Sequence, residues 1–196
     1  MTDYAKSISE AYEDLALNLQ KRQKEEGLLS FLASVQHFEE RWLQVEFALC
    51  LQKKLPDHHI WMEWKRFDIS IFKSRTDNQP VCIIEMKTVK NYALSYWLAG
   101  LKRDFEKLEK TRESYHGVEI FILAFALYTE PSTCDAKPPK CDKNDYHKKI
   151  EGCLLKGPLK RLPEKSLSHE TFFEVNNEIG KGFKEILMRG YLVKHS

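Results

Sequence analysis

Three charged side chains interrupt two short apolar segments near the middle of the chain. Asp68 belongs to the alternating segment 66–73, and Glu85 and Lys87 belong to the alternating segment 80–87. Alternation of apolar and polar residues is typical of β-strands, so both segments are predicted strands. Two carboxylates and a lysine, together with a divalent cation, are sufficient groups for hydrolysis of a phosphodiester.

The connection between these strands predicts how the charged residues are arranged. The polar turn 74–79 joins them as a hairpin, and a turn centred in this stretch pairs Asp68 with Glu85 and Ser70 with Ile83. Directly opposed residues share a face of the sheet, and the lysine two residues after Glu85 shares it as well. The three charged side chains are therefore expected to converge.

Two opposed carboxylates repel each other, which raises their pKa values and weakens strand pairing. A cation bound between them relieves this repulsion, and carboxylate oxygens suit Mg²⁺ or Mn²⁺. A neighbouring lysine can hold the attacking water, lower its pKa or neutralise charge that develops on the phosphate. A surface ion pair and a turn-facing carboxylate are the alternative interpretations, and the joint placement on paired strands favours the catalytic one.

The clearest predicted helix precedes the strands and spans residues 28–55. Its apolar residues recur at steps of three and four, and the stripe includes Trp42, Val45 and Leu49. Glu46 lies at the edge of this stripe. A carboxylate in such a position is costly unless it is paired, hydrated or bound to a metal, and a solvated helix position remains an equal alternative.

The other elements give the predicted fold class. A further strand, 59–65, precedes the hairpin, a helix is expected over 92–115, and the run 118–128 is apolar on both faces, as in a strand covered on both sides. The order helix, three strands, helix, strand predicts an α/β domain whose mixed central sheet is flanked by helices. This core would span about 28–128.

The two ends of the chain complete the single domain expected for 196 residues. Residues 4–26 form a predicted surface helix that Gly27 ends, and residues 130–196 form a variable, loop-rich extension. Three elements are expected in this extension: a short helix, a closing strand, and a helix or strand, over residues 146–155, 171–175 and 179–193.

The combination of strand, motif and helices resembles a known superfamily. Asp68 lies on one strand, the Glu-Met-Lys motif at 85–87 ends the next, and the flanking helices supply Glu46 and the charged segment 101–108. This pattern resembles the PD-(D/E)XK nucleases, which have the restriction-endonuclease-like fold and include restriction enzymes, Holliday-junction resolvases and repair nucleases. The family's proline before the aspartate is replaced by Phe67, as in divergent members.

The resemblance implies roles for particular residues. Asp68, Glu85 and Glu46 would bind the metal, Mg²⁺ or Mn²⁺, and Lys87 would be the catalytic lysine. Two residues of the second helix could support the site: Lys102 and Asp104. The implied function is metal-dependent endonucleolytic hydrolysis of DNA, in restriction, defence or repair. The alternatives are an RNA-directed nuclease and a nuclease fold that no longer cleaves and binds nucleic acid or protein.

The composition bears on partners and location. The net charge is only +2, but residues 1–64 hold 7 basic and 11 acidic groups, whereas residues 135–165 hold 9 basic and 5 acidic groups. The basic segment is either a phosphate-binding surface or a solvated loop. The candidate contacts to nucleic acid are Lys148, Lys149, Lys160 and Arg161. A homodimer is left open. The absence of a long apolar run and of a leader-like start predicts a cytoplasmic protein without membrane contact.

Overall fold

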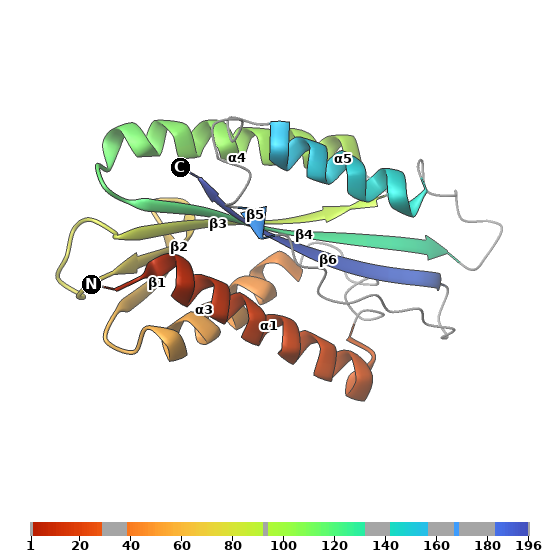
Figure 1. Ribbon diagram of the computed structural model, residues 1–196, viewed down its shortest axis with the longest axis horizontal. Coiled ribbons are helices and arrows are strands. Elements are labelled where there is room, and N and C mark those ends of the chain that lie inside the picture. Colours follow the sequence, from red (N-terminus) through yellow and green to blue (C-terminus); the bar gives the residue numbers. More distant parts are fainter. Residues whose placement is uncertain are drawn as a thin grey trace.

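A central mixed sheet with helices on both faces forms the fold (Figure 1). The computed structural model describes residues 2–28, 39–91, 94–131, 142–156, 167–168 and 183–195. Within these residues, six strands lie in the order β1-β2-β3-β4-β6-β5. Their bounds are β1 His59–Trp64, β2 Phe67–Phe72, β3 Cys82–Lys90, β4 Glu119–Pro131, β5 Leu167–Ser168 and β6 Phe183–His195.

Helices cover both faces of this sheet. The helices are α1 Tyr4–Glu26, α3 Glu39–Lys54, α4 Leu94–Ser114 and α5 Lys143–Lys156. Helices α1 and α3 lie on one face and α4 and α5 on the other, and each pair buries its own apolar cluster against the sheet (Figure 1). The α/β class and the chain order of helix, three strands, helix and strand are confirmed. Among the described residues, no helix combines the length and the apolar character needed to cross a bilayer.

Helix α1 is built as its sequence predicts. Tyr12 and Leu19 are buried on its inner face. The side chain of Asp3 accepts a hydrogen bond from the backbone N–H of Lys6 and caps the start of the helix. Gly27 ends it with a φ of 65°, a left-handed conformation that glycine adopts without steric cost. This helix and its end are confirmed.

Helix α3 differs from the prediction in the face that it buries. Leu43, Phe47 and Leu51 are fully buried, whereas Val45 is 42% exposed and Leu49 is 56% exposed. The predicted stripe was therefore wrong for Val45 and Leu49, whereas Trp42 packs against the core. Apolar residues occur on more than one face of α3, so spacing alone did not identify the inner one. Residues 29–38 of the predicted helix lie outside the described part of the chain.

The hairpin between β2 and β3 has the predicted register. Ser70 pairs with Ile83 and Ile69 with Ile84, after which the ladder ends.

Strand β4 runs parallel to β3 and antiparallel to β6, and residues 120–128 of β4 are all buried, as predicted for a strand covered on both faces. In the C-terminal part, α5 confirms the predicted short helix and β6 shows that its last element is a strand. The predicted strand 171–175 lies outside the described residues.

The turn between β1 and β2 has an unusual backbone. Trp64 pairs with Phe67, so Lys65 and Arg66 alone form the turn, with φ values of 48° and 71°. Positive φ at both central residues is typical of a type I′ turn, which favours Asn-Gly or Gly-Gly. Glu63 also has a positive φ, of 57°. Each non-glycine residue in this region costs roughly 1–2 kcal/mol.

Candidate functional site

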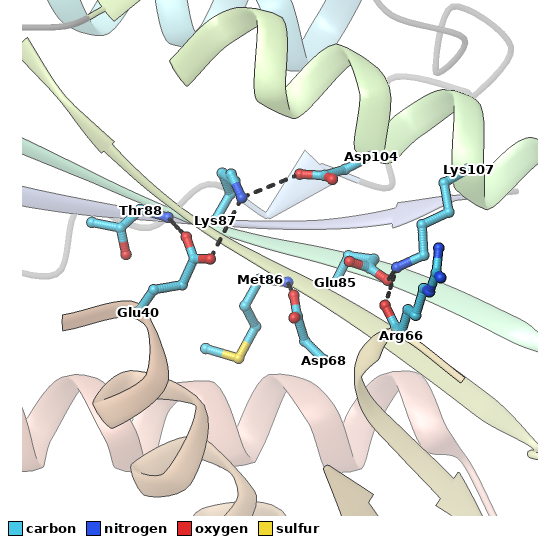
Figure 2. Close-up of polar contacts among 9 residues, drawn as sticks. All are labelled: Glu40, Arg66, Asp68, Glu85, Met86, Lys87, Thr88, Asp104 and Lys107. Carbon is cyan, nitrogen blue, oxygen red and sulfur yellow. Dashed lines mark hydrogen bonds and ion pairs between the residues drawn. The ribbon is translucent and has the colours of Figure 1, made fainter. Parts of the chain in front are cut away.

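Asp68 lies where β2 separates from β3, next to the motif on β3 (Figure 2). Its Oδ2 atom accepts a hydrogen bond of 2.6 Å from the backbone N–H of Met86. Burial raises the pKa of Asp68, while the Met86 hydrogen bond and the Lys107 and Lys87 ammonium groups oppose the rise. Asp68 is thus held at the strand end by the backbone of the residue that follows Glu85.

Glu85 is the most buried carboxylate of the site, with 5% of its side chain exposed. Its Oε1 atom lies 2.5 Å from Nζ of Lys107 on α4, and Lys107 also donates to the backbone carbonyl of Arg66 (Figure 2). Burial and the negative charge of Asp68 raise the pKa of Glu85 to about 8, although Lys107 acts in the opposite direction. Glu85 therefore holds its proton to a higher pH than an ordinary glutamate does, unless a stronger cation reaches it.

Lys87 lies between two carboxylates on the helix α4 side of the sheet. Its Nζ atom is 3.5 Å from Oε1 of Glu40 and 3.6 Å from Oδ2 of Asp104. Burial lowers the pKa of Lys87, but the carboxylates of Glu40, Asp104 and Asp68 outweigh it, and the net shift is upward. Lys87 is therefore an ammonium ion at neutral pH. It can stabilise negative charge but does not act as a base.

The acidic residue that α3 contributes is Glu40 and not Glu46. Glu40 accepts a 2.8 Å hydrogen bond from the backbone N–H of Thr88 and contacts Lys87 (Figure 2). Glu46 instead forms a 3.2 Å ion pair with Arg22 of α1. Six residues turn a helix by about 600°, which leaves these two side chains about 120° apart around the helix axis. The structure therefore does not bring Glu46, the predicted metal ligand of this helix, into contact with the cluster around Glu85.

Helix α4 contributes two residues on one face. Asp104 contacts Lys87 and Lys107 contacts Glu85, and residues three apart are neighbours on a helix surface. The structure brings the predicted supporting residue Asp104 to the site, whereas Lys102 is exposed and makes no described contact there. Lys107 was missed, although its spacing of three residues from Asp104 would have indicated it.

The charges of the cluster favour a bound cation. Its carboxylates and lysines are Glu40, Asp68, Glu85, Asp104, Lys87 and Lys107. Four carboxylates against two ammonium groups leave two negative charges when all are ionised. Carboxylate oxygens are the ligands that Mg²⁺ and Mn²⁺ prefer. The donor set at Asp68 and Glu85 therefore fits either ion.

In the arrangement described, each lysine of the cluster is paired with carboxylates. Within the described ranges, no three Asp, Glu, His or Cys side chains are gathered closely enough to form a metal site. Lys107 takes the cation position at Glu85, and Lys87 lies between Glu40 and Asp104. A metal ion bound at Oε1 of Glu85 would take the place of the Lys107 ammonium.

The basic residues predicted to contact nucleic acid are only partly described. Lys148 and Lys149 are exposed on α5, whereas Lys160 and Arg161 lie outside the described residues. Neither of the described lysines contacts the carboxylate cluster in the described structure. Their role in binding stays a prediction.

Gly100 of α4 leaves room for Lys87. A Cβ atom at this position would lie 3.4 Å from Cε of Lys87, an ordinary van der Waals contact. We expect Gly100→Ala to raise the thermal unfolding midpoint by about 2–4 °C, because alanine is favoured over glycine in a helix by about 1 kcal/mol. Gly100→Leu should lower the midpoint, because its longer side chain collides with Lys87.

Gly152 of α5 offers a matched control. A Cβ atom at Gly152 meets nothing within 4 Å, so Gly152→Ala and Gly152→Leu should both raise the midpoint. Unfolding midpoints of the four variants, measured by differential scanning calorimetry, separate the effect of helix propensity from that of the steric collision with Lys87. Equal midpoints for Gly100→Leu and Gly152→Leu would show that Lys87 does not fill the space beside Gly100.

No family model, no curated protein and no solved structure matches the chain. The function is therefore inferred from the contacts and charges of the described residues.

Proposed function

We propose that the protein is a metal-dependent endonuclease of the PD-(D/E)XK type that hydrolyses phosphodiester bonds in DNA. One observation carries the proposal: Asp68 and Glu85 lie together at the end of paired strands, where burial and the charge of Asp68 both raise the pKa of Glu85. Burying two carboxylates that repel each other is costly. A divalent cation bound by both carboxylates would offset this repulsion. The restriction-endonuclease-like core is part of the proposal and is supported by the order of elements around the site.

In this mechanism, Asp68 and Glu85 would hold Mg²⁺ or Mn²⁺, which when bound polarises the phosphodiester and activates water. A bond forms between the water oxygen and phosphorus, and the bond from phosphorus to the leaving sugar oxygen breaks. The attacking water gives up a proton to solvent, and the leaving oxygen takes one from solvent. The Lys87 ammonium donates hydrogen bonds to an oxygen that gains negative charge during this exchange. Glu40 and Asp104 keep Lys87 protonated and fix its position.

The rival function is a nuclease fold that binds nucleic acid or protein without cleaving it. The contact between Lys107 and Glu85 favours this rival, because it balances the buried carboxylate without a metal. The opposing observation is Lys87, which has its own two carboxylate partners and keeps its ammonium group beside Asp68. An enzyme needs this second cation, whereas a binding module does not.

Cleavage assays with and without a chelator test the proposal. Purified protein is incubated with supercoiled, linear, branched and single-stranded DNA and with RNA, in Mg²⁺ or Mn²⁺. We expect metal-dependent cleavage of DNA and a loss of about 100-fold or more in Asp68→Asn, because the variant lacks a charged ligand. Asp57→Asn, at an exposed position between α3 and β1, should leave cleavage unchanged. Cleavage that persists in the chelator would contradict the proposal, and cleavage of RNA alone would change the substrate.

A further inference from the structure

The turn between β1 and β2 consists of two cationic residues whose backbone conformation is unfavourable for both. Lys65 and Arg66 have φ values of 48° and 71°, whereas turns of this type favour asparagine followed by glycine. Non-glycine residues held in this conformation cluster at functional sites, where the surrounding structure maintains them. The side chains of the turn are both exposed, so burial does not explain their presence.

The turn is attached directly to the carboxylate cluster. The backbone carbonyl of Arg66 accepts a hydrogen bond from Lys107, whose Nζ atom also contacts Glu85 (Figure 2). The same Nζ atom lies 4.7 Å from the centre of the Phe67 ring, and Asp68 follows Phe67 in the chain. The backbone of the turn is therefore joined to Glu85 through Lys107 and lies two residues before Asp68 in the chain.

Lys65 is held in place although it is exposed. Its Nζ atom donates a 3.1 Å hydrogen bond to the hydroxyl of Tyr115 and lies 4.6 Å from the centre of the Trp64 ring. An ammonium group has three donors, so Tyr115 leaves two for a ligand. The guanidinium of Arg66 has no hydrogen bond or ion pair with the described residues. Both cations are thus available to an anion.

We propose that Lys65 and Arg66 bind the backbone phosphates of a nucleic acid next to the phosphate at Asp68 and Glu85. This inference rests on the proposed nuclease function. The carboxylate cluster alone repels a polyanion, and two cations at its border offset that repulsion. Arginine and lysine are the residues that most often neutralise nucleic acid phosphates, and each such contact makes the affinity depend on salt.

The test replaces the turn by its preferred sequence. In Lys65→Asn/Arg66→Gly, relief of the backbone should raise the unfolding midpoint by about 2–6 °C. Binding to a 20-nucleotide DNA duplex, measured by fluorescence anisotropy in a chelator so that no cleavage occurs, should weaken by about tenfold at 0.1 M salt. The slope of log affinity against log salt should fall by about two units, one for each lost phosphate contact.

Two further variants isolate the charge of the turn. Lys65→Arg/Arg66→Lys keeps both charges, so its slope should match that of the wild type. Lys73→Ala/Arg75→Ala removes two exposed cations from the turn between β2 and β3, beyond the opposite end of β2, and should leave the slope unchanged. Equal losses in all three variants would overturn the inference, because the effect would not belong to this turn.

The outcomes also separate this inference from the proposed function. An unchanged slope in Lys65→Asn/Arg66→Gly, with cleavage still lost in Asp68→Asn, would overturn the role of the turn and leave the nuclease proposal intact. A wild-type protein that binds no nucleic acid in the chelator would overturn the role of the turn as well. Metal-independent cleavage by the wild type, together with a reduced slope in Lys65→Asn/Arg66→Gly, would support phosphate binding by the turn and overturn the proposed mechanism.

Discussion

We expect Lys87→Met to slow DNA cleavage by about 10²–10³-fold while DNA affinity changes by less than about threefold. The structure gives the reason: Glu40 and Asp104 hold Lys87 as an ammonium ion beside Asp68, where it stabilises charge that appears only in the transition state. Methionine keeps the length of the side chain next to Gly100 and removes the charge. Single-turnover kinetics and anisotropy on the same duplex measure the two effects separately.

Lys102→Met is the matched control, because Lys102 is an exposed lysine of the neighbouring helix α4. Its cleavage rate should equal that of the wild type. The unfolding midpoint of Lys87→Met has to be measured as well, since Glu40 and Asp104 lose a shared partner. A folded Lys87→Met protein that cleaves at the wild-type rate would remove Lys87 from the mechanism.

The metal-free protein should become less stable as the pH rises from about 5 to 8, and Glu85 should be the main cause. Its pKa is about 8 in the folded state and 4.5 in its ordinary state. Between these values the folded protein binds a proton that the unfolded chain has lost, so stability falls as pH increases. One pKa unit corresponds to 1.36 kcal/mol, so the loss is on the order of 4 kcal/mol. The pKa values of Asp68, Glu40 and Asp104 are raised too and act in the same direction.

Glu85→Gln tests this pH dependence. The variant should be more stable than the wild type at pH 8, and its unfolding free energy should vary much less between pH 5 and 8, when both are measured by urea denaturation in a chelator. Glu113→Gln, at an exposed position of α4, should follow the wild-type curve. Mg²⁺ at pH 8 should stabilise the wild type and not Glu85→Gln. Parallel curves for wild type and Glu85→Gln would mean that Glu85 is not protonated in the folded protein.

The strands and the central site residues could be predicted because their evidence is local. Alternation in β2 and β3 and the position of the turn between them fixed the register, and with it the proximity of Asp68 and Glu85. Glu40 could not be predicted, because α3 has apolar residues on more than one of its faces. Which face is buried depends on how the helix packs against α1 and the sheet. Lys107 shares a face of α4 with Asp104, so helical spacing could have indicated it, but its contact with Glu85 depends on how α4 packs against β3.

The turn between β1 and β2 escaped prediction for a different reason. Lys65 and Arg66 carry no turn signal of the kind that glycine, proline or asparagine provides. Their conformation follows from the pairing of Trp64 with Phe67 on either side, which leaves two residues to reverse the chain. Strand pairing here overrides the local preference of both residues. The strand-like sequence pattern does not show the turn, and only the structure does.

The contact between Lys65 and Trp64 has an optical consequence. The excited state of an indole shifts electron density across the ring, so its emission responds to a charge a few ångströms away. The Lys65 ammonium lies 4.6 Å from the centre of the Trp64 ring, while Trp42 has the guanidinium of Arg22 at 5.0 Å on the opposite layer of the fold. The emission wavelength of Trp64 therefore depends on the position of Lys65. A ligand that moves Lys65 can thus be detected through Trp64 fluorescence without an added label.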